Sequence, residues 1–184
     1  AQRGLFVVLV GLDGSGKTLV ARRLCCQGPE QSRFGRIRYF HWQPRLLGRL
    51  DLPLPQPGNL PRKREQRPSL PAAVLSAARL LKNLVLTKLA HWLRVRPLLR
   101  SNSLVLVDRY YYNYFLDPVS VKYYGPAWLL RWARRWFPRP DLVVVLHAPP
   151  EVLLARKQEL ARAELLRQRA VLAPLPFAAG QPLV

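Results

Sequence analysis

Eight residues near the N-terminus, Gly11 to Thr18 (GLDGSGKT), have the types and spacing of a phosphate-binding loop, or P-loop. They fit Gly-x-x-x-x-Gly-Lys-Ser/Thr, in which glycines let backbone amides point at an anion and the lysine reaches the outer phosphates. The hydroxyl after the lysine is suited to hold Mg²⁺. The expected cofactors are therefore ATP and Mg²⁺. ATP would contact Gly11, Gly14, Ser15, Gly16 and Lys17, and Thr18 would contact the metal.

Asp13 lies within the same cofactor-binding loop, where a carboxylate is an unusual neighbour for phosphates. A negative side chain gains nothing by facing an anion. We therefore expect Asp13 to point away from the phosphates, toward a hydroxyl of the phosphoryl acceptor.

Asp108 and Arg109 follow the short apolar run Ser103 to Val107, which predicts a buried strand. Parallel strands present their carboxyl ends at one edge, beside the P-loop. Asp108 is thus expected to orient Mg²⁺, and Arg109 to grip a phosphate bidentately. The alternative is a strand-end salt bridge that only holds the loop.

A third group is the basic segment 151–172, which includes Arg156, Arg162, Arg167 and Arg169. Arginines that close over a transferred phosphoryl group compensate its charge. A helix with a solvated face has the same pattern, so both interpretations stay open.

The elements that must position these residues alternate between strand and helix, which is typical of a parallel sheet covered by helices. We expect one α/β domain over residues 1–184, a P-loop NTPase three-layer sandwich with about five strands and helices on both faces. Residues 53–71 read as an exposed Pro/Arg-rich loop and 151–172 as a lid-like helix. Strands are expected at Leu5–Val10, Arg36–Trp42, Ser103–Val107, Asp141–Leu146 and Phe177–Val184, after which a covering helix is missing, and helices at Lys17–Cys26, Ala72–Leu99 and Pro126–Phe137.

Two features of these elements read as structural. Trp128, Trp132 and Trp136 are spaced by four and share a helix face, where we expect a packing seam of the core. Asp141 begins a strand at the edge opposite the nucleotide, so we expect no catalytic role for it.

Composition limits the binding partners and the cellular compartment that we expect for this protein. The formal charge of +20 attracts polyanions of any kind. Because the basic residues are dispersed, nucleic acid is a less expected partner, while contact with an acidic membrane surface and a homodimer stay open. The apolar stretch Ala72 to Leu93 is interrupted by basic residues, and we expect it not to span a bilayer. Cys25 and Cys26 are adjacent and have no partner elsewhere, which indicates a reducing, cytoplasmic setting.

Three segments together resemble the thymidylate kinase family: GLDGSGKT, VDRYYY at 107–112 and PDLVVVLHAPPEVLLAR at 140–156. The resemblance implies an ATP- and Mg²⁺-dependent nucleoside monophosphate kinase. It implies that Asp13 bonds the acceptor's 3′-hydroxyl, that Asp108 and Arg109 contact Mg²⁺ and phosphates, and that Arg156 is catalytic. Gly14 after the acidic residue implies a catalytic arginine from the lid, for which Arg162, Arg167 and Arg169 are candidates.

The resemblance is weaker where acceptor specificity is set. The family's Arg-Glu-Pro-Gly-Gly is replaced by Trp42 to Leu46, which keeps Pro44 and a nearby Arg45. Its Asp-Arg pair from the middle helix is not found at Thr87 to His91, and Tyr110 to Pro118 also departs from the usual pattern. This looks like a divergent subgroup.

Three functions follow as hypotheses. The first is phosphoryl transfer to a nucleoside monophosphate, with dTMP as the expected acceptor and Asp13, Arg45 and Arg109 as its ligands. The second is a kinase of the same family that acts on another phosphorylated acceptor, such as a sugar phosphate or a surface-polysaccharide intermediate. The third is a nucleotide-gated module that binds polyanions without kinase activity.

Overall fold

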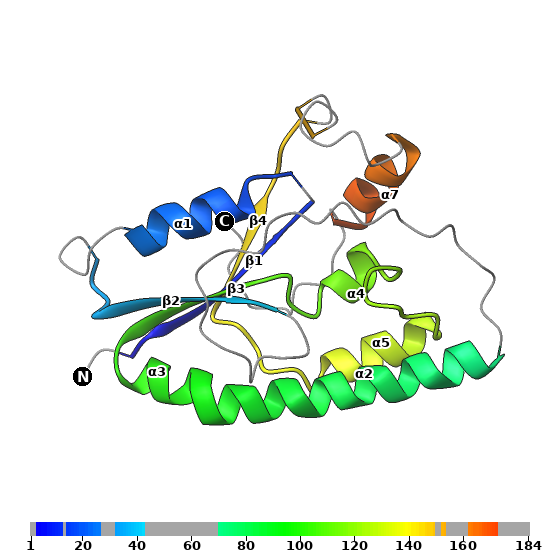
Figure 1. The fold of residues 1–184 in the computed structure, drawn as a ribbon, viewed down its shortest axis with the longest axis horizontal. Helices are drawn as coiled ribbons and strands as arrows, with labels where there is room; N and C mark the ends of the chain where they lie inside the picture. The colour runs from blue at the N-terminus through cyan, green and yellow to red at the C-terminus, as the bar shows by residue number, and fades with distance from the viewer. Residues whose placement is uncertain are drawn as a thin grey trace.

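The computed structural model describes residues 3–12, 14–26, 32–42, 70–149, 152–153 and 162–172. In this part of the chain the centre is a parallel sheet in the order β2-β3-β1-β4 (Figure 1). The strands are β1 (Leu5–Gly11), β2 (Arg36–His41), β3 (Ser103–Asp108) and β4 (Leu142–Leu146). Each begins or ends within a residue or two of the range expected from its apolar pattern.

The expected sheet of about five strands has four in the described part of the chain. The segment expected to supply the fifth, Phe177 to Val184, lies outside the described residues. β3 is buried at all six positions because it pairs with β2 on one side and β1 on the other. Such strands read as continuous apolar runs.

The two faces of the sheet bury alternate residues of β1, as the period of a strand requires. Val7 and Leu9 pack with Ala21 and Phe34 on the side of α1 (Lys17–Cys26). The helix on this side begins at Lys17, the lysine of the P-loop.

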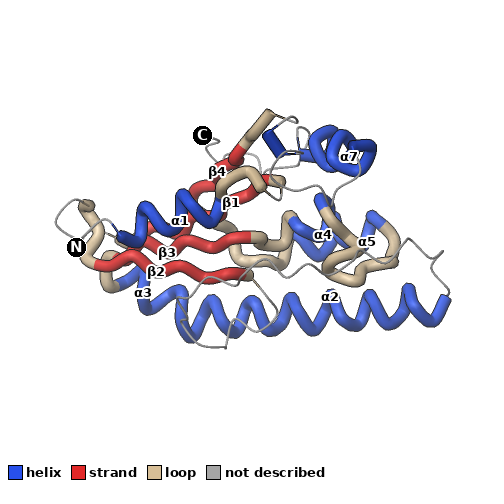
Figure 2. The backbone as a smooth tube through the Cα atoms, turned by 45° about the horizontal axis from the view of Figure 1, so that its top comes forward, coloured by secondary structure: helices blue, strands red, loops and turns tan. Residues whose placement is uncertain are grey.

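The opposite face holds the larger core. There Phe6 and Val8 pack with Leu80 and Leu84 of α2 (Leu70–Ala90). The same face is covered by α3 (Arg96–Arg100), α4 (Asn113–Leu116) and α5 (Ala127–Arg134), so helices lie on both sides of the sheet (Figure 2). The three-layer α/β sandwich expected from the sequence is confirmed.

The helix or two expected over Ala72 to Leu99 is one helical run, Leu70–Arg100, in which α2 continues through the π-helical turn η2 (His91–Val95) into α3. By length and composition this run contains a window long and apolar enough to cross a membrane, and 28% of that window is buried. The expectation that its basic residues exclude a span is therefore not supported on those grounds.

The tryptophans of α5 lie on one side of the helix, but that side faces solvent. The exposed fractions are 62% for Trp128, 45% for Trp132 and 49% for Trp136. The expectation of a core seam was wrong because Leu130 and Ala133 occupy the buried side instead.

The expected helix 151–172 is described only in part, at residues 152–153 and in α7 (Arg162–Leu172). In α7, the guanidinium of Arg167 donates to the carbonyl of Leu116 at the end of α4, at 3.1 Å. This contact anchors α7 beside α4.

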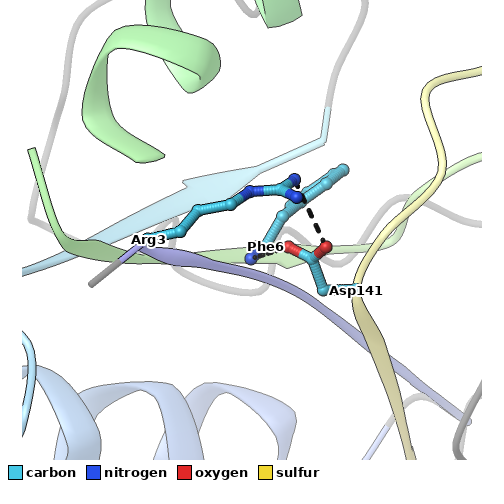
Figure 3. A network of polar contacts seen from close by, with 3 residues as sticks. All are labelled: Arg3, Phe6 and Asp141. Atoms are coloured by element: carbon cyan, nitrogen blue, oxygen red, sulfur yellow. Dashed lines mark hydrogen bonds and ion pairs between the residues drawn. The ribbon is translucent and has the colours of Figure 1, made fainter. Parts of the chain in front are cut away.

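Asp141 joins two strands at the edge of the sheet far from the P-loop (Figure 3). Its Oδ2 accepts the backbone N–H of Phe6 at 2.8 Å, and Phe6 in turn accepts the N–H of Asp141 at 2.8 Å. Arg3 forms an ion pair with the same carboxylate at 3.5 Å. These contacts fit the structural role expected for Asp141.

We predict that Asp141→Ala lowers the free energy of unfolding by about 1–3 kcal/mol, because the N–H of Phe6 loses its carboxylate acceptor. Arg3→Ala is the matched control. The Arg3 side chain is 73% exposed, and exposed ion pairs contribute about 0–1 kcal/mol. Urea unfolding monitored by circular dichroism measures both; equal losses in the two variants would contradict the prediction.

Candidate phosphate-binding site and acceptor cavity

The P-loop runs from the end of β1 at Gly11 to the start of α1 at Lys17, the strand-loop-helix context that the motif requires. Gly14 and Gly16 have φ of +90° and +89°. L-residues rarely adopt this conformation, whereas glycine does so without steric cost. The chain can therefore turn from the end of β1 into the N-terminus of α1, the helix end that favours anions.

Gly11 must be glycine for a different reason, because its neighbours leave no room for a side chain. A Cβ on this residue would lie 2.7 Å from the carbonyl oxygen of Leu146, its partner in β4. It would also lie 2.7 Å from Oγ of Ser15. The first glycine of the motif thus lets β4 and the loop approach one another.

Lys17 lies beneath this loop and is 6% exposed. Its Nζ donates to the carbonyls of Gly11 and Leu12, at 2.8 and 2.7 Å. Two backbone oxygens at the start of the loop therefore hold the ammonium group. Thr18, one residue on, lies in the first turn of α1 with an exposed side chain.

Leu153 packs against the P-loop, a contact that no sequence motif predicted. It is 1% exposed and packs with Leu12 and Ala148. Its Cδ2 lies 3.4 Å from the position of a Cβ on Gly14. The segment after β4 is thereby packed against the P-loop.

Asp108 ends β3 at the same edge of the sheet, opposite Leu9 of β1 and His41 of β2. Its carboxylate is 3% exposed, and the Tyr39 hydroxyl donates to Oδ2 at 3.2 Å. Burial, together with the negative charge of Asp108, raises the pKa of Tyr39 well above its usual value. Tyr39 therefore stays protonated and remains a donor to this carboxylate.

Two buried oxygens at this edge have no hydrogen-bond partner among the described residues: Oδ1 of Asp108 and Oγ of Ser15. Carboxylate and hydroxyl oxygens are the ligands Mg²⁺ prefers. The described residues contain no group of three or more His, Cys, Asp or Glu side chains that could enclose a metal. The donors present thus fit a Mg²⁺ ion that keeps waters and substrate oxygens, with Asp108 and Thr18 as the expected protein contacts.

Arg109 has φ of +59°, a left-handed conformation unusual for a bulky residue. Such strain often marks a functional position. Arg109 lines a narrow cavity together with Gly11, Lys17 and Asp108, and it also lines a second, larger cavity. The structure thus brings together four of the residues predicted from sequence, and one of them, Arg109, lines both cavities.

The larger cavity has a volume of about 390 Å³, within the usual range for small-molecule sites. Four cationic side chains line it, and among the described residues no carboxylate does. They come from α2 (Arg79 and Lys82), from the end of β3 (Arg109) and from the loop after α4 (Lys122). This charge pattern suits a phosphorylated molecule.

Polar groups in the floor of this cavity are only partly paired. Nδ2 of Asn83 donates to the hydroxyl of Tyr114 at 2.8 Å. Oδ1 of Asn83 and Nε1 of Trp42 are buried without a hydrogen-bond partner in the described part of the chain. Both atoms are buried beneath the cavity lining and are not exposed to the cavity in this structure.

The family's Asp-Arg pair of the middle helix was not found at Thr87 to His91 in the sequence. The structure shows that Arg79 and Lys82, two turns earlier, line the cavity instead. Helical spacing was the available signal, since residues 79, 82 and 83 share one side of α2. The spacing alone did not indicate which side faces the sheet edge.

Several predicted site residues are not placed by the structure. Asp13, Arg45 and Arg156 lie outside the described residues, as do residues 53–69 of the expected loop, whereas Leu70 and Pro71 belong to α2 and not to a loop. Arg162 begins α7, but its side chain is not described, and the same holds for Arg169. Their expected roles stay predictions.

We predict that Gly11→Ala destabilises the fold by about 1–3 kcal/mol, because the added methyl group forces β1 and β4 apart. Gly35→Ala is the matched control, since a Cβ there meets nothing within 4 Å. Its effect should stay within about 0.5 kcal/mol. Thermal and urea unfolding measure the difference, and an unperturbed Gly11→Ala variant would contradict the proposed close approach.

Curated proteins and solved structures include chains that are similar to this one. The chain is 30% identical over 158 residues to a curated thymidylate kinase of Xanthomonas euvesicatoria, covering 83% of this chain and 60% of that protein. It is 31% identical, with the same coverage, to a thymidylate kinase of Xanthomonas campestris. The chain thus spans 60% of the length of these relatives. No protein-family model matches.

Two solved structures share the fold. Thymidylate kinase from Candida albicans aligns with a TM-score of 0.55 and 18% identity, covering 99% of this chain and 83% of that one. Thymidylate kinase from Ehrlichia chaffeensis aligns with a TM-score of 0.56 and 14% identity, covering 99% and 86%. In sequence this chain is similar to curated thymidylate kinases over 60% of their length, and in fold it resembles two solved thymidylate kinases.

Proposed function

We propose that the protein catalyses ATP- and Mg²⁺-dependent transfer of a phosphoryl group to a nucleoside monophosphate, with dTMP as the expected acceptor. One observation carries the proposal: Arg109 lines both the narrow cavity at Lys17 and Asp108 and the larger basic cavity. A phosphate donor in the P-loop and a phosphate acceptor in the basic cavity would then share one guanidinium between them.

At the donor side, Lys17 would neutralise the β- and γ-phosphates, whose positions lie over the loop glycines. Mg²⁺ would supply further charge neutralisation to these phosphates, with Thr18 and Asp108 as its protein contacts. The Tyr39 hydroxyl orients the Asp108 carboxylate toward this edge. Loop and carboxylate are held before substrate arrives, as electrostatic stabilisation requires.

In the transfer itself, an oxygen of the acceptor phosphate forms a bond to the γ-phosphorus as the bond between that phosphorus and the β-γ bridging oxygen breaks. ADP leaves with the electron pair of the broken bond, and no oxidant or reductant is needed. Catalysis of this kind rests on positioning and charge compensation. Arg109 contacts both reactants, and Arg156 and Arg162 are proposed to complete the charge compensation from the lid.

At the acceptor side, Arg109 and Arg45 are proposed to bind the acceptor phosphate and Asp13 to bond a sugar hydroxyl. Arg79, which also donates to the carbonyl of Lys122 at 3.2 Å, is a further candidate contact because it lines the same cavity.

The setting of the protein is part of this proposal. Cys25 and Cys26 are both free thiols, which fits a reducing compartment, and we retain the cytoplasm as the expected location. We also retain residues 1–184 as a single domain.

We predict that Lys17→Ala lowers ATP-dependent turnover by about 100-fold or more, because the phosphates lose their buried cation. Arg23→Ala, which removes an exposed charge from the same helix, should leave turnover unchanged. Release of ADP in a coupled assay with dTMP is the measurement. Equal turnover in the two variants would reject the P-loop assignment.

The acceptor is tested separately. We predict that Arg79→Gln raises the KM for dTMP about 10-fold or more without changing the KM for ATP, because only the acceptor cavity loses a charge. Arg100→Gln, at the exposed end of α3, is the control. The same assay across nucleoside and sugar monophosphates distinguishes the hypotheses: turnover with sugar phosphates alone would exclude a nucleoside monophosphate kinase.

A further inference from the structure

The two oxygens of the Asp108 carboxylate have different surroundings. Oδ2 accepts a hydrogen bond from the hydroxyl of Tyr39, on the neighbouring strand β2, at 3.2 Å. Oδ1 is buried and has no hydrogen-bond partner among the described residues. Buried polar atoms in folded proteins nearly always have a partner, whether protein, water or ion. Oδ1 therefore marks a place for a ligand, and Tyr39 holds the other oxygen of the same group.

The pairing of β2 with β3 explains why the Tyr39 hydroxyl reaches this carboxylate. Tyr39 pairs with Leu106, and Asp108 lies two residues farther along β3. Side chains two residues apart on a strand point to the same face of the sheet. Tyr39 and Asp108 therefore share the face covered by α1, and the long tyrosine side chain spans the diagonal between them.

The end of β2 also fixes the backbone and the donor ring. The backbone N–H of Trp42 donates to the carbonyl of Asp108 at 2.8 Å. The Tyr39 ring packs in the apolar layer beneath α1 that includes Leu24 and Ile37. A ring held in such a layer keeps its hydroxyl in one place. One strand thus restrains both the main chain and the side chain of Asp108.

The space beside the carboxylate is small enough for its orientation to matter. The narrow cavity lined by Asp108, Gly11 and Lys17 has a volume of about 10 Å³. Such a volume is near the least that holds one water molecule. Mg²⁺ also requires close to ideal octahedral geometry, with oxygens at about 2.0–2.1 Å. A carboxylate that rotated freely would meet these conditions only part of the time.

We propose that Tyr39 is a positioning residue for Mg²⁺ that acts through Asp108. By donating to Oδ2, the hydroxyl fixes the carboxylate so that Oδ1 is left for the metal ion or for one of its waters. This inference rests on the proposed function, because Mg²⁺ is expected there with ATP. No motif of the sequence includes residue 39, since it lies on a different strand from both the P-loop and the Asp-Arg pair.

Binding of Mn²⁺ in the presence of ADP tests the proposal without turnover. Free Mn²⁺ gives an electron paramagnetic resonance signal that is lost on binding, so a titration yields Kd. Tyr39→Phe keeps the ring and removes only the hydroxyl. It should raise the Kd for Mn²⁺ about 10-fold or more, as loss of an outer partner of a metal ligand does.

Tyr123→Phe is the matched control. The Tyr123 hydroxyl also makes one hydrogen bond, to the carbonyl of Pro126 at 2.9 Å. Neither residue lines the narrow cavity. This variant should therefore change the Kd for Mn²⁺ less than about 2-fold, as expected for a site without a shared partner. Circular dichroism checks that both variants fold.

A double-mutant cycle separates positioning from packing. If Tyr39 acts through Asp108, Tyr39→Phe should change the Kd for Mn²⁺ less than about 2-fold when Asp108→Asn is already present. In the coupled assay, Tyr39→Phe alone should raise the half-saturating Mg²⁺ concentration and leave the KM for dTMP unchanged. A general disturbance of the fold would move both.

The outcomes distinguish this inference from the proposed function. Unchanged Mn²⁺ binding by Tyr39→Phe would overturn the inference and leave the proposed kinase intact. Equal losses with and without Asp108→Asn would assign Tyr39 a packing role, which also overturns it. No Mn²⁺ binding by the unaltered protein with ADP would overturn both. The expected Mn²⁺ results without turnover of dTMP would reject that acceptor and still support the role of Tyr39.

Discussion

The parallel pairing of β1 between β3 and β4 is the constraint on which the rest of the molecule depends. Because all three strands run in the same direction, they bring Gly11, Asp108 and Leu146 to one edge of the sheet. Gly11 has no side chain, so Leu146 can approach it closely enough for β4 to pair with the end of β1. The P-loop, the candidate metal contact Asp108 and the following Arg109 therefore lie at one edge of the sheet. They do so because the strands run in the same direction.

Charge is distributed unevenly around this framework. The described carboxylates lie in positions with a specific partner: Asp141 with the N–H of Phe6, Asp108 with the hydroxyl of Tyr39, and Asp117 with the N–H of Ser120. The larger cavity, by contrast, is lined by cations and by no carboxylate of the described residues. This cavity is thereby suited to a small anion.

The long helix Leu70–Arg100 contributes to this cavity. Arg79, Lys82 and Asn83 line the larger cavity, Leu80 and Leu84 pack in the core, and the segment from Val85 to Leu93 carries exposed apolar residues. A single helix thus has three different environments along and around it. Its apolar composition is consequently a poor guide to burial.

The sequence by itself determined the elements and the donor site of this protein, because these depend on local patterns. The β-branched runs predicted the strands within a residue or two, and the motif from Gly11 to Thr18 predicted the loop between β1 and α1. The position of Asp108 followed from its place at the end of an apolar run, since parallel strands end at one edge.

Only the tertiary structure decided which side of each helix is buried. Trp128, Trp132 and Trp136 satisfied the periodicity of a core stripe, yet Leu130 and Ala133 pack inward because they fit beneath the helix and the indole rings remain outside. Likewise, the periodicity of α2 did not indicate that Arg79 faces the cavity, since that depends on how the helix lies against β2 and β3. Helical spacing defines which residues share a face, whereas packing against the sheet determines what that face contacts.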